Sequence, residues 1–184
     1  MRSSRVLIVV LASILFPAMA PAGDLSPDDK AFLDKNISSI VRIDYTLMDD
    51  PAITKVFGAH FFRVKIIIKE ELGEQTQELV VMRAGEKLAN VSAPGSEGDL
   101  PELVKMFKAG FALKTDADAK LLQQALDILY PPFTDEDKKL VAFVHAGNQW
   151  TFVRGKFFDG KKGYVFTTDP AGAITGAKFM LKMP

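Results

Sequence analysis

The first run of apolar residues at helical spacing follows a sequence that typically starts a helix. Ser26 stands at the expected N-cap, and Pro27 would occupy the first helical position. The apolar residues that then share one helix face are Phe32, Leu33, Ile37, Ile40 and Val41. This pattern predicts a helix over residues 27–42, and Asp50-Pro51 predicts a second, short helix that ends near Gly58.

The apolar residues change from helical to alternating spacing after the second predicted helix. β-Branched and aromatic residues crowd residues 61–68, and similar stretches follow at residues 78–83 and 88–92. The connections, at Gly73 and at residues 84–87, are too short for the crossover that a parallel pair needs. These three strands are therefore predicted to form an antiparallel meander.

A second series of helices and strands follows a linker rich in glycine, proline and serine at residues 93–98. One helix is predicted to start at residue 99 or 101 and to end near Gly110. The next is predicted to start after Thr115 and to end at Pro131-Pro132. The rest is predicted as a short helix over residues 134–144 and strands over residues 150–158, 164–168 and 174–183. The predicted fold class is α+β, with antiparallel meander sheets and helices packed on one face.

The order of elements in the first half, a helix followed by three strands, recurs in the second half. An offset of 89 residues aligns Ser26 with Thr115 and Val64 with Val153, so a helix cap and a strand position share one register. The two halves, which would form one compact unit, are residues 23–98 and 99–184. Two such helix-plus-three-strand repeats would resemble the tandem layout of the secreted β-lactamase inhibitor proteins, although this chain has no cysteine for that family's disulfides. The alternative is a single α+β domain whose curved sheet wraps around helices, as in cystatin-like folds.

The first 22 residues have the three parts of a cleavable export signal. Two arginines give the positive N-terminal part, and the apolar core over residues 6–16 is too short for a membrane span, which needs about 20 residues. Small residues follow at the spacing of a processing site, and Pro21 disfavours cleavage after Ala20, so cleavage after Ala22 is expected. The expected product is a periplasmic or secreted protein without a membrane span, and a retained N-terminal anchor is the alternative.

The composition of this expected product speaks against several classes of function. Removal of 22 of the 184 residues leaves 162, and the remaining 21 basic and 23 acidic residues give a net charge of −2. A nearly neutral chain without a basic cluster offers no electrostatic surface for nucleic acid or anionic lipid. The absence of cysteine excludes disulfides, thiol catalysis and thiolate metal sites.

No motif in the sequence predicts catalysis, and we expect no cofactor and no metal. His60 and His145 are candidates for a general base or for metal ligands, but neither has a histidine or carboxylate at the spacing of a helical metal site. Each lies at an expected helix-to-strand junction, where an ordinary surface histidine is the simpler interpretation. Gly155, Gly160 and Gly163 lie across an expected hairpin and are interpreted as turn glycines, not as a phosphate-binding loop.

Aromatic and basic residues share one face of the two strands that the repeat would pair. The positions on this face are Phe61, Arg63, Lys65, Trp150, Phe152, Arg154 and Lys156. Such a composition is typical of protein-binding surfaces, although helices would equally bury it as core. The sequence therefore favours a non-enzymatic binding module of the cell envelope with a protein or peptide partner. The alternative is a small-ligand carrier or an enzyme with an apolar pocket between sheet and helices, in which a histidine supplies a polar group.

Overall fold

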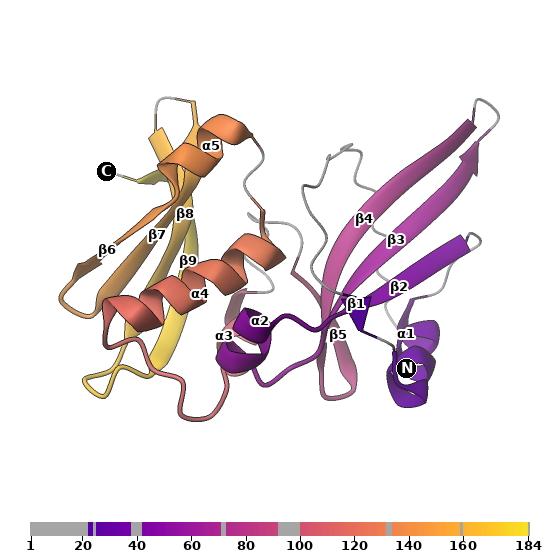
Figure 1. Ribbon diagram of the computed structural model, residues 1–184, viewed down its shortest axis with the longest axis horizontal. Helices are drawn as coiled ribbons and strands as arrows, with labels where there is room; N and C mark the ends of the chain where they lie inside the picture. The colour runs from indigo at the N-terminus through magenta and orange to yellow at the C-terminus, as the bar shows by residue number, and fades with distance from the viewer. Residues whose placement is uncertain are drawn as a thin grey trace, which may run out of the picture.

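The computed structural model describes residues 22–23, 25–37, 42–70, 73–91, 100–131, 134–158 and 160–183. Apart from Ala22, the expected export signal lies outside these residues, as does the expected linker. The described ranges contain five helices and nine strands, and the strands form two antiparallel sheets (Figure 1). This arrangement confirms the α+β fold class. None of the helices in these ranges is long and apolar enough to cross a membrane.

The first sheet is a meander with the strand order β1-β2-β3-β4-β5. Its strands are β1 (Ala22–Gly23), β2 (Arg42–Met48), β3 (Phe61–Glu70), β4 (Gly73–Ala84) and β5 (Lys87–Asn90). Helix α1 (Pro27–Asn36) precedes β2, and α2 (Pro51–Val56) connects β2 to β3. Both helices begin at the predicted caps: the Ser26 hydroxyl accepts from the Asp29 N–H at 3.1 Å, and the Asp50 carboxylate accepts from the Ala52 N–H at 2.7 Å.

The second sheet follows three helices and has the strand order β6-β7-β8-β9. The helices are α3 (Leu100–Lys105), α4 (Asp116–Leu129) and α5 (Asp135–Leu140), and the strands are β6 (Ala142–Ala146), β7 (Gln149–Phe157), β8 (Gly160–Thr168) and β9 (Ile174–Met183). Helix α4 starts at a capping box in which Thr115 and Asp118 each bind the other's backbone N–H. The predicted cap at Thr115 is therefore confirmed.

The sequence analysis did not predict three strands: the two-residue β1 and β2 in the first sheet, and β6 in the second. Helix α1 ends at Asn36 and α5 at Leu140, so both helices are shorter than predicted. In β2, the residues Ile43, Tyr45 and Leu47 alternate and pack toward α1, which is a strand signal that the short stretch did contain. In β6, four of five residues are exposed, so that strand lacks a clear apolar period.

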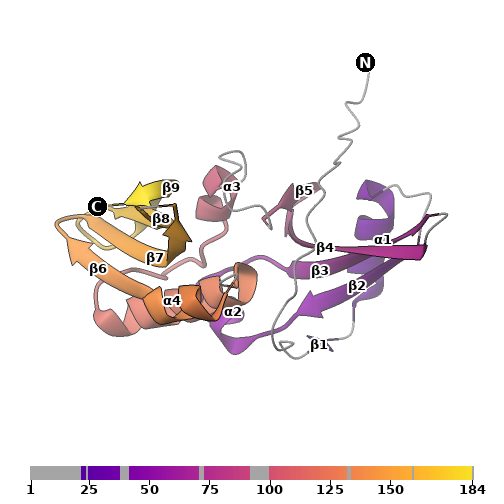
Figure 2. The same cartoon turned by 90° about the horizontal axis from the view of Figure 1, so that it is seen from above.

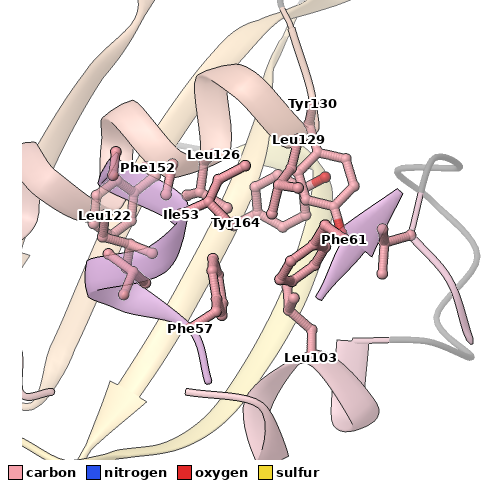
Figure 3. Packing of buried hydrophobic residues seen from close by; sticks show 14 of the residues in the cluster. Ile53, Phe57, Phe61, Leu103, Leu122, Leu126, Leu129, Tyr130, Phe152 and Tyr164 are labelled. Atoms are coloured by element: carbon pink, nitrogen blue, oxygen red, sulfur yellow. The ribbon is translucent and has the colours of Figure 1, made fainter. Parts of the chain in front are cut away.

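One apolar core contains side chains from both sheets and from the helices between them (Figure 3). Phe61 of β3, Leu126 of α4 and Phe152 of β7 belong to this core, and all three are fully buried. Phe57 follows α2, and its ring centroid lies 5.1 Å from that of Phe61 and 4.9 Å from that of Phe107. The two halves of the chain therefore share a core. A smaller core lies between α1 and the other face of the first sheet, with Phe32, Leu33, Phe62, Val64 and Val81.

The structure does not confirm the tandem repeat. The proposed register aligns Val64 with Val153, but Val64 packs toward α1, whereas Val153 lies in a small cluster with Leu140 and Val165, apart from the residues that pack on α4. Equivalent strand residues of a true repeat would face equivalent helices, because a shift of one residue exchanges the faces of a strand. The order of elements also differs, since a strand precedes the short helix in the first half and follows it in the second.

The buried position of Phe61 gives a direct test of the shared core. Replacement of Phe61 by Ala removes a fully buried ring and should lower the free energy of unfolding by about 3–5 kcal/mol. Chemical denaturation followed by the fluorescence of the single tryptophan measures this change. Lys65→Ala, on the same face of the same strand but exposed, is the matched control and should change stability by no more than about 1 kcal/mol. Equal effects of the two substitutions would contradict the assignment of Phe61 to the core.

Candidate functional site

The aromatic and basic face predicted from the sequence divides into a buried and an open part. The buried residues are Phe61, Trp150, Phe152 and Arg154. The residues that reach solvent, Arg63 only partly, are Arg63, Lys65 and Lys156. The seven residues therefore do not form one exposed surface, because four of them are buried, as the alternative of a covered face expects. Alternation correctly places Phe61 on the same face as Lys65, but it does not show which part of a face is covered by helices.

The open part lies on β2, β3 and β4, where these strands extend away from α2, α4 and the second sheet (Figures 1 and 2). Asp44, Lys65 and Glu78 stand directly opposite one another across these three strands, and we call these residues the charged row. Lys65 is exposed, as is Thr76 on the same face. The Oε2 atom of Glu78 is buried and has no hydrogen-bond partner in the part of the chain that the structure describes. A buried carboxylate oxygen without a donor is energetically costly.

Arg154 belongs to the buried part and holds the C-terminal end of α4 against β7. Its Nη1 donates to the carboxylate of Asp127, and its Nη2 donates to the carbonyl oxygens of Tyr130 and, at 3.4 Å, Leu126. The last carbonyl groups of a helix lack intrahelical partners and carry partial negative charge. A buried guanidinium satisfies them, which explains Arg154 as a structural residue and not as part of a binding surface.

A β-bulge brings α5 close to β7 beside Arg154. Val153 pairs with Gly163 and Gly155 with Lys162, which leaves Arg154 as the extra residue of the bulge. Gly155 has φ +143°, and a Cβ at this position would lie 2.2 Å from Oδ1 of Asp137 on α5. The same Oδ1 accepts from the N–H of Lys156 at 2.8 Å. Gly155 therefore permits a close approach inside a strand, and its interpretation as a turn glycine is wrong, as is that of Gly163 in β8.

A second polar cluster joins the N-terminal end of α1 to β3 and β4. We call it the Asp29 cluster, and its members are Ser26, Asp28, Asp29, His60 and Arg83. Asp29 is buried; its Oδ2 accepts from Ser26 Oγ at 2.9 Å and lies 3.0 Å from His60 Nδ1, while its Oδ1 accepts from Arg83 Nη1 at 3.0 Å. Arg83 also donates to Asp28 at 2.6 Å, and the side chain of His60 is 61% exposed. One buried carboxylate is thus bound by the nearby Ser26 and by two side chains that are distant in sequence, His60 and Arg83.

The Asp29 cluster does not have the order of a nucleophilic triad. In a Ser-His-Asp triad the imidazole lies between the hydroxyl and the carboxylate, so that it takes the proton of the nucleophile. Here the carboxylate lies in the middle, because Ser26 and His60 both bind Oδ2 of Asp29. Ser26 is also the N-cap of α1, which assigns its hydroxyl to the helix. The cluster therefore fastens α1 to the sheet.

The second histidine lies on the other sheet. His145 in β6 stacks on the buried Trp150, with ring centroids 4.1 Å apart and an interplanar angle of 11°. Its Nε2 lies 2.8 Å from the carbonyl oxygen of Gly147. Among the residues that the structure describes, no group of three or more histidine, cysteine, aspartate and glutamate side chains is arranged to hold a metal ion.

The hydrogen bonds of the Asp29 cluster make it sensitive to acid. Burial raises the pKa of Asp29, but the hydrogen bonds from Ser26, Arg83 and His60 outweigh burial and bring its pKa below the ordinary value. A carboxylate whose pKa is lowered by folding stabilises the protein above its unfolded pKa. That contribution is lost as pH falls through the folded pKa.

Asp29→Asn should therefore change both stability and its pH dependence. At neutral pH we expect a loss of about 1–3 kcal/mol in the free energy of unfolding, because Arg83 and His60 lose a charged partner. Below about pH 4 the difference between the variant and the wild type should shrink, since the wild type loses the same charge. Chemical denaturation at a series of pH values measures this. Asp116→Asn, an exposed carboxylate at the start of α4, is the control, and an identical pH profile for wild type and Asp29→Asn would refute the role of Asp29.

Comparison with known proteins assigns the chain to no family. No protein-family model, no curated protein and no solved structure matches it. The expected resemblance to the β-lactamase inhibitor proteins depended on the tandem repeat, which the structure does not confirm. Function has to be inferred from the charged row, the Asp29 cluster and the edges of the two sheets.

Proposed function

We propose that this chain is a non-enzymatic binding module of the cell envelope that recognises a protein or peptide through the open end of its first sheet. The observation that carries the proposal is the charged row, in which Oε2 of Glu78 is buried without a hydrogen-bond partner in the described part of the chain. This atom lies on the face that also exposes Lys65 and Thr76. A site with an unsatisfied buried acceptor favours a ligand that brings a donor.

The chemistry of the row defines the partner more closely. Asp44 and Glu78 lie opposite Lys65 in the register of three adjacent strands. Neighbouring strands lie about 4.8 Å apart, so the row spans roughly 10 Å. An extended segment that crosses the strands with an acidic side chain toward Lys65 and a donor toward Glu78 would match these two neighbouring positions. Such complementarity contributes mainly specificity and association rate, because each exposed pair adds little affinity.

The arrangement of the remaining polar groups speaks against nucleophilic catalysis. In the Asp29 cluster, the imidazole of His60 contacts the carboxylate of Asp29 and not a hydroxyl group that it could activate. Arg154 is occupied by the end of α4, and Trp150 and Phe152 belong to the core. These contacts support a binding role in preference to an enzymatic one.

Export to the envelope is part of the same proposal. It rests on the signal-like first 22 residues, and it assigns the new N-terminus to the edge of the first sheet, where Gly23 pairs with Leu47. Expression of the full chain in a bacterial host should yield an envelope fraction whose intact mass lacks residues 1–22. Loss of only 20 residues would move the cleavage site to Ala20, and a full-length cytoplasmic product would contradict export.

Site-specific photo-crosslinking tests the binding surface. A photoreactive residue at Thr76, on the same face as the charged row, should give a discrete crosslinked protein in an envelope extract. The same residue at Lys35 of α1, exposed on the helix that packs on the other face, should not. Glu78→Lys should reduce the Thr76 crosslink by about tenfold or more, because it places a cation where a donor is expected to bind.

Two outcomes would overturn the proposed surface. Equal crosslinking at positions 76 and 35, or a Thr76 crosslink that is insensitive to Glu78→Lys, would show that the charged row does not select the partner. A complete lack of crosslinks would favour the small-ligand alternative, since Trp150 Nε1 and Tyr164 Oη are buried without hydrogen-bond partners in the described chain.

A further inference from the structure

The outer edge of the second sheet is formed by β6, a five-residue strand whose one partner within the described ranges is β7. Four of its residues are exposed, and the side chain of Val144 is 60% exposed, one of three large apolar side chains so exposed among the described residues. Natural edge strands are commonly protected by lysine, proline, a bulge or a covering helix. The segment AFVHA contains neither lysine nor proline, and its pairing with β7 runs without a bulge.

The other sheet edges are paired or contacted along part of their length: β5 pairs with residues 81–84 of β4, and β1 pairs with Leu47 and Met48 of β2. Helix α3 lies against β9 at the opposite edge of the second sheet, and α1 lies near β5 in the first. Strand β1 has only two residues. Figure 1 shows β6 at the outside of the second sheet, on the side away from the first sheet. In the second sheet, β6 is therefore the edge strand that has no outer partner along its whole length within the described residues, and it carries the exposed Val144.

The hairpin between β6 and β7 determines which backbone groups of β6 are unused. Ala146 pairs with Gln149 across the two-residue turn Gly147-Asn148, and this closing pair exchanges both hydrogen bonds. Hydrogen-bonded pairs then alternate, so Val144 bonds to Thr151 of β7. Phe143 and His145 direct their N–H and C=O groups away from β7. The edge thus offers two donors and two acceptors at the two-residue spacing of a strand.

We propose that β6 pairs with β6 of a second copy of this chain, antiparallel and centred on Val144, to form a continuous eight-stranded sheet. In this register Phe143 of each copy lies opposite His145 of the other, and the four outward N–H groups and four outward C=O groups satisfy one another. Val144 meets Val144 as a close, non-hydrogen-bonded pair, a favourable position for β-branched residues. The edge is therefore complementary to itself, as a two-fold interface requires.

The side chain of Val144 extends an existing apolar row toward this contact. Val144 is opposite Thr151, and Thr151 is opposite the buried Val165, on the face that carries the small cluster of Val153 and Val165. On the other face, Phe143 packs into the shared core and His145 stacks on Trp150, which keeps both residues in strand geometry. The edge is thus ordered before a partner binds, and its pairing costs little conformational entropy.

Sedimentation analysis of the purified protein over a concentration series tests the pairing. The mass should approach twice that of one chain, and Val144→Lys should weaken the dimer by about tenfold or more, because it replaces an apolar pair by two like charges. Leu181→Lys is the matched control, since Leu181 is 46% exposed on β9 and lies outside the proposed contact. A monomeric mass at every concentration would overturn the proposal, as would equal weakening by the two substitutions.

The absence of cysteine allows a test of the register itself. In the proposed pair the two Val144 Cα atoms are about 4.5 Å apart, within disulfide range. Val144→Cys should therefore form a covalent dimer on mild oxidation, whereas Thr175→Cys on β9 and His145→Cys should not. Preferential crosslinking through position 145 would refute this register, and a monomer that binds a foreign peptide at β6 would refute self-pairing.

Discussion

Phe61 and Phe152 lie on different sheets but in one apolar core, and the rest of the structure depends on this joint burial. Helix α4 contributes Leu122 and Leu126 to this core, which therefore contains side chains from both halves of the chain (Figure 3). On the first sheet, the core covers only one end of one face, where β3 begins and β4 ends. The far end of that face remains open, and the polar residues of the charged row are the consequence.

Each long helix is attached to its sheet by a buried charge as well as by apolar packing. At the N-terminal end of α1 the buried charge is the carboxylate of Asp29, and at the C-terminal end of α4 it is the guanidinium of Arg154. The negative charge of Asp29 suits the partial positive charge at the N-terminal end of α1. The positive charge of Arg154 suits the partial negative charge at the C-terminal end of α4. Loss of one partner at either site would leave the other charge unpaired, so these contacts define how each helix is oriented more than they add net stability.

The sequence predicted those features that local chemistry determines. The caps at Ser26 and Thr115, the strand that begins at Phe61 and the strand over residues 174–183 all follow from residues within a few positions of one another. Strand β6 could not be recognised in this way, because its exposed residues give no period. The candidate face failed for a related reason: alternation relates Phe61 to Lys65, but coverage by α4 is a contact between distant parts of the chain. The Asp29 cluster joins residues more than 50 positions apart, and no sequence spacing indicates it.

The two surfaces proposed for this protein lie at opposite ends of the molecule, since β6 is at the outside of the second sheet and the charged row is on the projecting strands of the first (Figure 1). Pairing through β6 would therefore leave the charged rows of both copies accessible. A dimer of this kind would bind a repeated or surface-bound partner twice. The second contact would then be intramolecular, with an effective concentration set by the fixed distance between the rows. Weak individual contacts at exposed charges would be compensated by this bivalency, which gives the unprotected edge of β6 a role in recognition.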